Sequence, residues 1–109
     1  MDGEISYIEV GSGDAAATAR FLSALFGWSF TPMGDAGWFQ TPSIRAGLHG
    51  DDPEHGIVPY FRVADIEAGA ARVRELGGTV EGPGEDEPGF GRFCNCRDAQ
   101  GLRFGLHQP

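Results

Sequence analysis

The chain has 109 residues, of which 40% are hydrophobic and 11% aromatic. That length suits one shared structure rather than two independent cores, and the apolar content excludes an intrinsically disordered chain. The formal net charge of −8 disfavours a nucleic acid partner, because binding phosphates requires clustered Lys and Arg. No basic, apolar leader opens the chain and no apolar run reaches the roughly 18 residues of a membrane span, so we expect a cytoplasmic protein with no membrane partner.

The first half of the sequence predicts a strand, a helix and three more strands. Alternation predicts a strand over 5–10, Asp14 occupies the N-cap position of a helix, and Gly27 is suited to end that helix. Short strands over 28–30, 37–40 and 44–49 complete a first module over residues 1–50. Residues 51–56 contain Gly and Pro among polar side chains, which predicts a solvated linker that includes His55.

The second half repeats this order. Arg45-Ala46-Gly47-Leu48-His49 returns 58 residues later as Arg103-Phe104-Gly105-Leu106-His107, and Asp14, Leu25 and Gly27 return 51 residues later as Asp65, Leu76 and Gly78. A strand over 57–63, a helix from Asp65 to Leu76 and strands over 79–81, 90–96 and 102–107 form a second module over residues 57–109. Extra loop at 83–89 accounts for the seven-residue difference between the two offsets.

Two cysteines lie two residues apart on a predicted strand. Cys94 and Cys96 therefore point to one face, where a disulfide between them is disfavoured and a zinc site has too few ligands. We expect two thiols that pack in the core of a protein from a reducing compartment.

The outer strands of each module have one apolar face and one unusual face. The apolar face must pack against the helices, because alternate side chains leave a strand on opposite sides. The other face mixes Tyr, Arg and His with glycine, which often marks a close approach to the backbone. Its members are Tyr7, Glu9, Arg45, Gly47, His49, Val58, Tyr60, Arg62, Arg103, Gly105 and His107. This pattern favours a ligand-sized concave face, although a merely solvated face remains the alternative.

The chain resembles the vicinal oxygen chelate superfamily, the group of glyoxalases, bleomycin-resistance proteins and extradiol dioxygenases. The resemblance rests on the duplicated order of elements and on the following segments: Leu25-Phe26-Gly27-Trp28, Tyr60-Phe61-Arg62-Val63-Ala64-Asp65-Ile66, Leu76-Gly77-Gly78 and Asp98-Ala99-Gln100-Gly101. It implies an α+β fold in which two tandem βαβββ modules form a curled, cup-shaped mixed sheet with helices on the outer face. It also implies a homodimer.

The resemblance places the metal ligands of catalytic members at Tyr7, Gly47, Val58 and Gly105. Glycine and valine have no side-chain donor and a neutral tyrosine is a poor ligand, so we expect no metal and no other cofactor. A displaced site is the alternative, because Glu9, His49 and His107 lie two residues further along three of the same strands.

Three functions follow as hypotheses. The first is a metal-free protein that binds a small aromatic or cationic molecule, such as an antibiotic or a metabolite. The second is a metal-independent lyase, isomerase or cyclase of secondary metabolism, with His49, His107 and Glu9 as candidate acid-base residues beside the two tyrosines. The third is an interaction module with an empty cup. The predicted ligand-binding residues are Tyr7, Glu9, Trp38, Phe39, His49, Tyr60, Arg62, Arg103 and His107.

Overall fold

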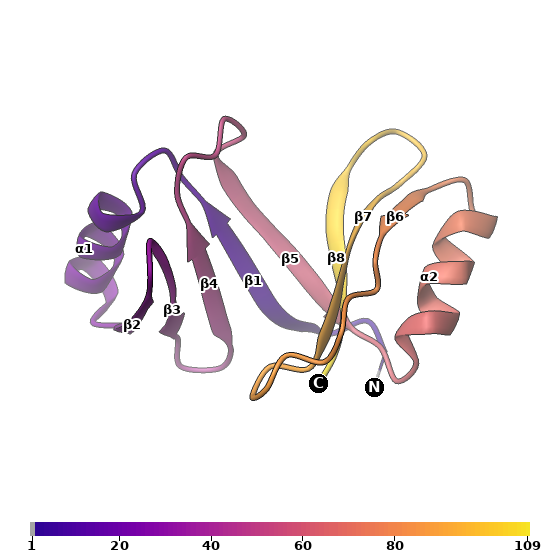
Figure 1. Cartoon of the computed structure of the whole chain (residues 1–109), viewed down its shortest axis with the longest axis horizontal. Helices are drawn as coiled ribbons and strands as arrows, with labels where there is room; N and C mark the ends of the chain where they lie inside the picture. Colours follow the sequence, from indigo (N-terminus) through magenta and orange to yellow (C-terminus); the bar gives the residue numbers. More distant parts are fainter. Residues whose placement is uncertain (1) are drawn as a thin grey trace. The chain divides into compact units, whose positions relative to one another are not determined.

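A computed structural model describes residues 2–109 and confirms the first predicted module (Figure 1). Its elements are β1 (Ile5–Gly11), α1 (Ala15–Phe26), β2 (Ser29–Met33), β3 (Ala36–Gln40) and β4 (Arg45–His49). Asp14 is the N-cap of α1, accepting a hydrogen bond from the Ala17 amide at 3.1 Å, and Gly27 ends the helix in the left-handed conformation. Strand β2 is longer than predicted and contains Pro32, which an edge strand tolerates.

The second module has the same order of elements. They are β5 (Gly56–Arg62), α2 (Ile66–Glu75), β6 (Thr79–Glu81), β7 (Arg92–Arg97) and β8 (Arg103–Gln108). Asp65 caps α2 by accepting a hydrogen bond from the Ala68 amide at 3.1 Å. Strand β7 begins later than predicted, because Gly91 closes a turn onto the Glu87 carbonyl at 2.9 Å. No helix in the described part of the chain is long and apolar enough to cross a membrane.

Strand pairing is mixed within each module. The strands run in the order β2-β3-β4-β1 in the first and β5-β8-β7-β6 in the second. The first and last strands of each module pair in parallel, β1 with β4 and β5 with β8, whereas the remaining pairs are antiparallel. The predicted α+β class with two βαβββ modules is therefore confirmed.

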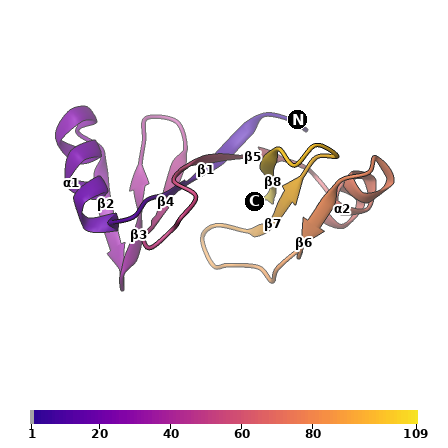
Figure 2. The same ribbon diagram turned by 90° about the horizontal axis from the view of Figure 1, so that it is seen from above.

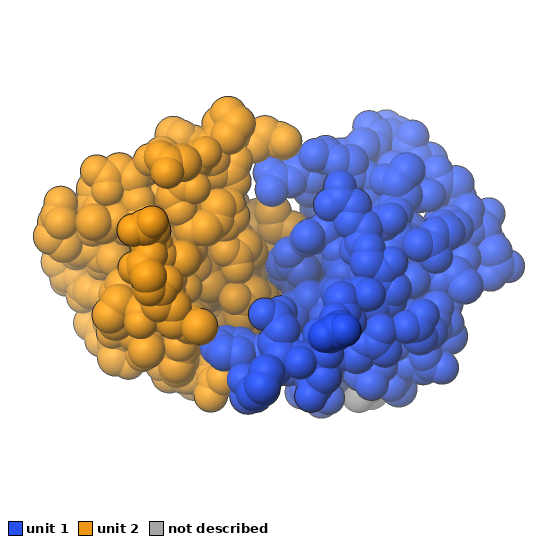
Figure 3. Space-filling model, in the orientation of Figure 1, with its two compact units in different colours: residues 1–6, 59–109 blue, residues 7–58 orange. Residues whose placement is uncertain are grey.

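The chain forms two compact units whose boundaries differ from those of the predicted modules. Unit 1 contains residues 1–6 and 59–109, and unit 2 contains residues 7–58 (Figure 3). The first residues belong to unit 1 because Gly3 donates to the Arg62 carbonyl at 2.8 Å and Arg62 donates to the Glu4 carbonyl at 2.7 Å. The candidate site described below lies wholly within unit 2.

Each unit has its own cluster of buried side chains. In unit 2, α1 lies beside β2–β4 and covers Val10, Phe39, Ala46 and Leu48 (Figures 1 and 2). In unit 1, α2 packs against β6, β7 and β8, and its Ile66 is buried with Cys94, Cys96 and Leu106. Each helix covers the apolar face of its own strands, so the polar sheet face of each unit is not covered by that unit's helix.

The two thiols pack in unit 1 as predicted. Cys94 and Cys96 are buried and unoxidised, with their sulfur atoms 3.8 Å apart. The contact with Cys94 and burial together raise the pKa of the Cys96 thiol, so that thiol stays protonated. The same contact lowers the pKa of the Cys94 thiol, but both side chains are almost completely buried and belong to the core of unit 1.

Candidate functional site

The polar face of unit 2 is the surface opposite α1. The register places Trp38 on β3 beside Gly47 on β4, and Gly47 beside Glu9 on β1. Tyr7 and His49 lie on the same face, two residues along β1 and β4, since alternate residues of a strand share a face. One row of the sheet thus brings an aromatic ring, a glycine and a carboxylate together.

His49 is held between two carboxylates on this face. Its Nδ1 lies 2.6 Å from Glu9 Oε2, and its Nε2 lies 2.7 Å from Asp52 Oδ2. The Tyr7 hydroxyl donates to Glu9 Oε1 at 3.1 Å, which extends the network along β1. The side chains of His49, Glu9 and Asp52 are 40%, 25% and 14% exposed, so the network borders solvent at the imidazole. We call Glu9, His49 and Asp52 the imidazole clamp.

Two glycines make room for the imidazole clamp. A Cβ atom at Gly47 would overlap the Tyr7 hydroxyl and a carboxylate oxygen of Glu9. A Cβ atom at Gly11, the register partner of His49, would overlap Asp52 Oδ2 and lie 3.0 Å from His49 Nε2. Position 47 therefore needs a glycine, because other side chains lie directly over its backbone.

The sequence reasoning missed Asp52, which it assigned to a solvated linker. The Asp52 amide donates to the Ser12 carbonyl at 3.1 Å, which ties the loop after β4 to the end of β1. The Asp52 side chain also accepts from the Glu54 amide at 2.8 Å, an arrangement typical of aspartate in turns. Gly11 was the available signal, because a glycine at a strand end beside His49 leaves space for a third side chain.

The electrostatics of the imidazole clamp favour the imidazolium form of His49. The hydrogen bond to Glu9 is the main cause that raises the pKa of His49 above its ordinary value. Burial opposes this rise, and the hydrogen bond to Asp52 adds to it. With the imidazole protonated, both ring N–H groups donate to carboxylates. The clamp then carries one positive and two negative charges.

His107 is the repeat partner of His49, but its surroundings are different. It is 6% exposed, accepts at Nδ1 from the Ser6 hydroxyl at 2.7 Å and donates from Nε2 to the Phe90 carbonyl at 2.6 Å. The ring stacks on Phe93 with centroids 4.5 Å apart. Burial lowers the pKa of His107, so it stays neutral with both nitrogens engaged. Both ring nitrogens of His107 are thus bonded within unit 1, and a role for it as an acid-base or metal-binding residue stays a prediction.

The remaining predicted site residues of unit 1 are engaged with their neighbours. Tyr60 is 7% exposed and its hydroxyl donates to the Asn95 side chain. Arg62 lies 3.2 Å from Glu4 in a largely exposed ion pair. Arg103 lies opposite Arg97 across β7 and β8. Tyr60, Arg62 and Arg103 belong to unit 1, whereas the imidazole clamp belongs to unit 2.

Of the two aromatic residues predicted on β3, only one lies on the polar face. Trp38 is half-buried, and the Arg45 guanidinium lies 4.5 Å from the centroid of its ring. Phe39 is fully buried and packs against Trp28 and Phe30 in the core of unit 2. Phe39 therefore lies on the face opposite Trp38, because consecutive residues of a strand point to opposite faces.

The residues at the four family metal positions do not fit a divalent ion. The space next to Gly47 is filled by Tyr7 and Glu9, and a Cβ atom at Gly105 would overlap the Tyr60 ring. Val58 is buried and offers no donor. Across residues 2–109, no three His, Cys, Asp or Glu side chains are grouped as metal ligands. A hydrogen-bonded tyrosine-glutamate pair thus occupies space that a metal-ligating side chain would need.

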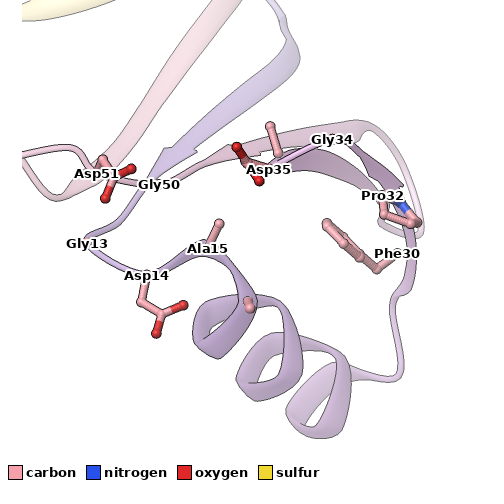
Figure 4. Close-up of a pocket in the computed structure, with 11 residues that line it drawn as sticks. Gly13, Asp14, Ala15, Phe30, Pro32, Gly34, Asp35, Gly50 and Asp51 are labelled. Carbon is pink, nitrogen blue, oxygen red and sulfur yellow. The ribbon is translucent and has the colours of Figure 1, made fainter.

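A cavity of about 610 Å³ lies elsewhere in unit 2, between the start of α1 and the β2–β3 hairpin (Figure 4). Asp14, Asp35 and Asp51 line it together with Phe30 and Pro32, and no basic side chain does. This acidic lining favours cations near unit 2 but does not by itself define a binding site.

The two βαβββ modules define a glyoxalase-type fold. The model of the family described as "Glyoxalase-like domain" matches residues 7–107, so the chain belongs to that family and to the vicinal oxygen chelate superfamily. Two curated relatives match at 30% identity over 128 aligned positions: the anthracycline biosynthesis proteins DauV of Streptomyces sp. (strain C5) and DnrV of Streptomyces peucetius. Each alignment covers 95% of this chain and 46% of the relative, so the chain spans about half the length of both relatives.

Solved structures share the fold at low sequence identity. Methylmalonyl-CoA epimerase from Mycobacterium tuberculosis has a TM-score of 0.72 at 17% identity, covering 98% of this chain and 87% of that one. Homoprotocatechuate 2,3-dioxygenase from Arthrobacter globiformis has a TM-score of 0.79 at 18% identity, covering 98% of this chain and 36% of that one. At these identities the likeness establishes the fold, and function must be argued from the site.

Proposed function

We propose that this protein binds a small aromatic or cationic molecule on the polar face of unit 2 without using a metal. The observation that carries the proposal is the packing of Tyr7 and Glu9 over Gly47, which puts a hydrogen-bonded pair beside a family metal position. The net charge of −8 and the carboxylates of the clamp attract a cation, and Trp38 supplies an aromatic surface. The likeness to two anthracycline biosynthesis proteins supports a ligand from secondary metabolism.

Tryptophan fluorescence tests this proposal, because the two tryptophans report on different places. Trp28 packs on Phe26 and Phe39, whereas Trp38 lies on the polar face. We expect an anthracycline to quench fluorescence saturably in the Trp28→Phe variant, where Trp38 is the reporter. Saturable quenching should be much smaller in Trp38→Phe. Equal quenching in both variants would place the ligand elsewhere.

The absence of a metal is tested separately. Elemental analysis of protein purified without chelator should find less than about a tenth of an equivalent of any divalent metal, the level expected of an unoccupied site. Calorimetric titration with Zn²⁺, Mn²⁺ or Mg²⁺ should show no stoichiometric binding. Micromolar binding that is lost in Glu9→Gln would instead support the displaced metal site.

A metal-independent enzyme is the second candidate, and the imidazole clamp is the observation in its favour. An imidazole that borders solvent and contacts two carboxylates can hold a proton near neutral pH. The reaction would be an isomerisation, elimination or cyclisation on an anthracycline-type intermediate. Product formation that disappears in His49→Ala favours this candidate, and saturable binding without product favours sequestration.

A homodimer is the third part of the proposal, in line with the superfamily resemblance. Large hydrophobic side chains are exposed on both units, among them Phe21, Leu25 and Leu76. A second copy that covered some of them would remove apolar surface from water. Sedimentation velocity at micromolar concentration should show a dimer, and a monomer across that range would exclude this part.

A further inference from the structure

We propose that His49 is an internal counter-ion that a cationic ligand displaces, so that binding of the cation releases one proton. This inference rests on the proposed function and specifies how the same site is regulated. It starts from the imidazole clamp, in which one ring contacts Glu9 at 2.6 Å and Asp52 at 2.7 Å. The two carboxylates that attract an external cation are the ones that the imidazolium already neutralises.

The charges of the clamp give the direction of the effect. With His49 protonated, Glu9, Asp52 and His49 sum to −1, and with His49 neutral they sum to −2. When a ligand ammonium binds the neutral-imidazole form, the net charge of the clamp and ligand together is −1. Binding to the protonated form would give a net charge of 0, but it would bring two cations into contact. Binding is then the exchange of one cation for one proton: protein-HisH⁺ and ligand-NH₃⁺ give the protein-ligand-NH₃⁺ complex and H⁺. Atoms and charge balance on both sides.

The geometry allows the exchange. The His49 side chain is 40% exposed and leaves its ring accessible, whereas the two carboxylates are held by other donors. Tyr7 donates to Glu9, and the Glu54 amide donates to Asp52, so both acids keep their positions when the imidazole loses its proton. The clamp therefore has a replaceable cation between two anchored anions.

The other charged groups near the clamp do not provide the same switch. Arg45 lies four residues from His49 along β4, which is about 13 Å in a strand and beyond the Debye length of about 8 Å at physiological ionic strength. Asp51 and Glu54 flank Asp52 in the exposed loop and add negative charge that favours any cation. His55 is exposed in the same loop, which makes it a matched control for a histidine outside the clamp.

The experiment compares two probes that differ in charge. Doxorubicin, an anthracycline whose amino sugar is protonated at neutral pH, and its neutral aglycone are titrated calorimetrically between about pH 5.5 and 7.5, the range in which histidine changes charge. Each titration is repeated in two buffers with different heats of ionisation, which gives the number of protons released. The proteins are the wild type, His49→Gln and the control His55→Gln.

We expect the affinity for doxorubicin to rise with pH, by up to about tenfold per pH unit while His49 is mostly protonated, with release of up to one proton. His49→Gln should lose the pH dependence and the proton release, and His55→Gln should keep both. The aglycone should bind with little dependence on pH. Circular dichroism of each variant verifies that it is folded.

Two different failures are distinguishable. If both compounds bind with the same pH-independent affinity, or if His49→Gln keeps the slope, the proton exchange is wrong while the binding function stands. If neither compound binds at millimolar concentration, the proposed ligand class is wrong and the exchange fails with it. An affinity for doxorubicin that falls as pH rises would also overturn the proposal.

Discussion

The repeat-equivalent glycines Gly47 and Gly105 should respond very differently to alanine. At Gly105 the new Cβ would overlap the ring of Tyr60, which is 7% exposed, bonded to Asn95 and in edge contact with Phe93 at 5.6 Å. At Gly47 it would meet only the outer ends of Tyr7 and Glu9. A rigid buried ring has nowhere to move, whereas a partly exposed carboxylate does.

The magnitudes follow from these contacts. For Gly105→Ala, overpacking costs about 1–3 kcal/mol and a lost hydrogen bond about 1 kcal/mol, against a gain of about 0.5–1 kcal/mol from replacing glycine in a strand. The net loss of stability is about 2 kcal/mol, or about 8 °C in Tm for a domain of this size. For Gly47→Ala, the solvent-screened contacts of Glu9 contribute at most about 1 kcal/mol, and the gain from removing glycine nearly cancels their loss.

Urea unfolding followed by tryptophan fluorescence and circular dichroism measures both variants. We expect Gly47→Ala to remain within about 1 kcal/mol of wild type. Its effect should appear instead in the NMR titration of His49, whose pKa falls when Glu9 is pushed away. A Gly47→Ala variant that is less stable than Gly105→Ala would refute the reasoning.

Three further predictions concern histidines, serines and caps. The raised pKa of His49 stabilises the fold at pH values below the unfolded pKa of about 6.5, and this stabilisation should fade as pH rises through the folded pKa. The free energy of unfolding of His49→Gln should lack this pH dependence. The lowered pKa of His107 has the opposite effect on the pH dependence of stability, because stability is lost as pH falls below about 6.5. NMR should resolve the titrations of the two histidines. Ser6→Ala should lower the free energy of unfolding by about 1–2 kcal/mol, because it leaves the buried His107 Nδ1 without its donor. Ser12→Ala should leave that free energy unchanged, since the buried Ser12 Oγ has no hydrogen-bond partner in the described structure. Asp65→Ala should cost about 1 kcal/mol in thermal unfolding by removing the cap of α2, and a change below a few tenths would contradict the assigned role.

Much of the fold was predictable because its signals are local. The caps Asp14 and Asp65, the glycine after α1 and the period-two alternation of the outer strands each act through residues a few positions apart. The repeat then fixed the order of the elements, since a duplicated pattern carries the same constraints twice. Shifted ends such as those of β2 and β7 depend on an edge position and a turn, which the pattern does not show.

The candidate site was predictable only in part. The face of Tyr7, Glu9 and His49 followed from alternation, but alternation says nothing about what covers a face. His49 and His107 occupy equivalent places in the repeat, and only the tertiary structure surrounds one with carboxylates and the other with Ser6, Phe90 and Phe93.

The amino-acid sequence by itself determined the order of elements in the two βαβββ modules and which residues of the outer strands share a face. The family metal positions came instead from the resemblance to the superfamily. The tertiary structure decided which polar residues meet, because the return of Asp52 onto His49 depends on a loop held to Ser12 by backbone hydrogen bonds. Contacts of that kind join segments about 40 residues apart, as in the pair of Glu9 and His49, and no local pattern encodes them.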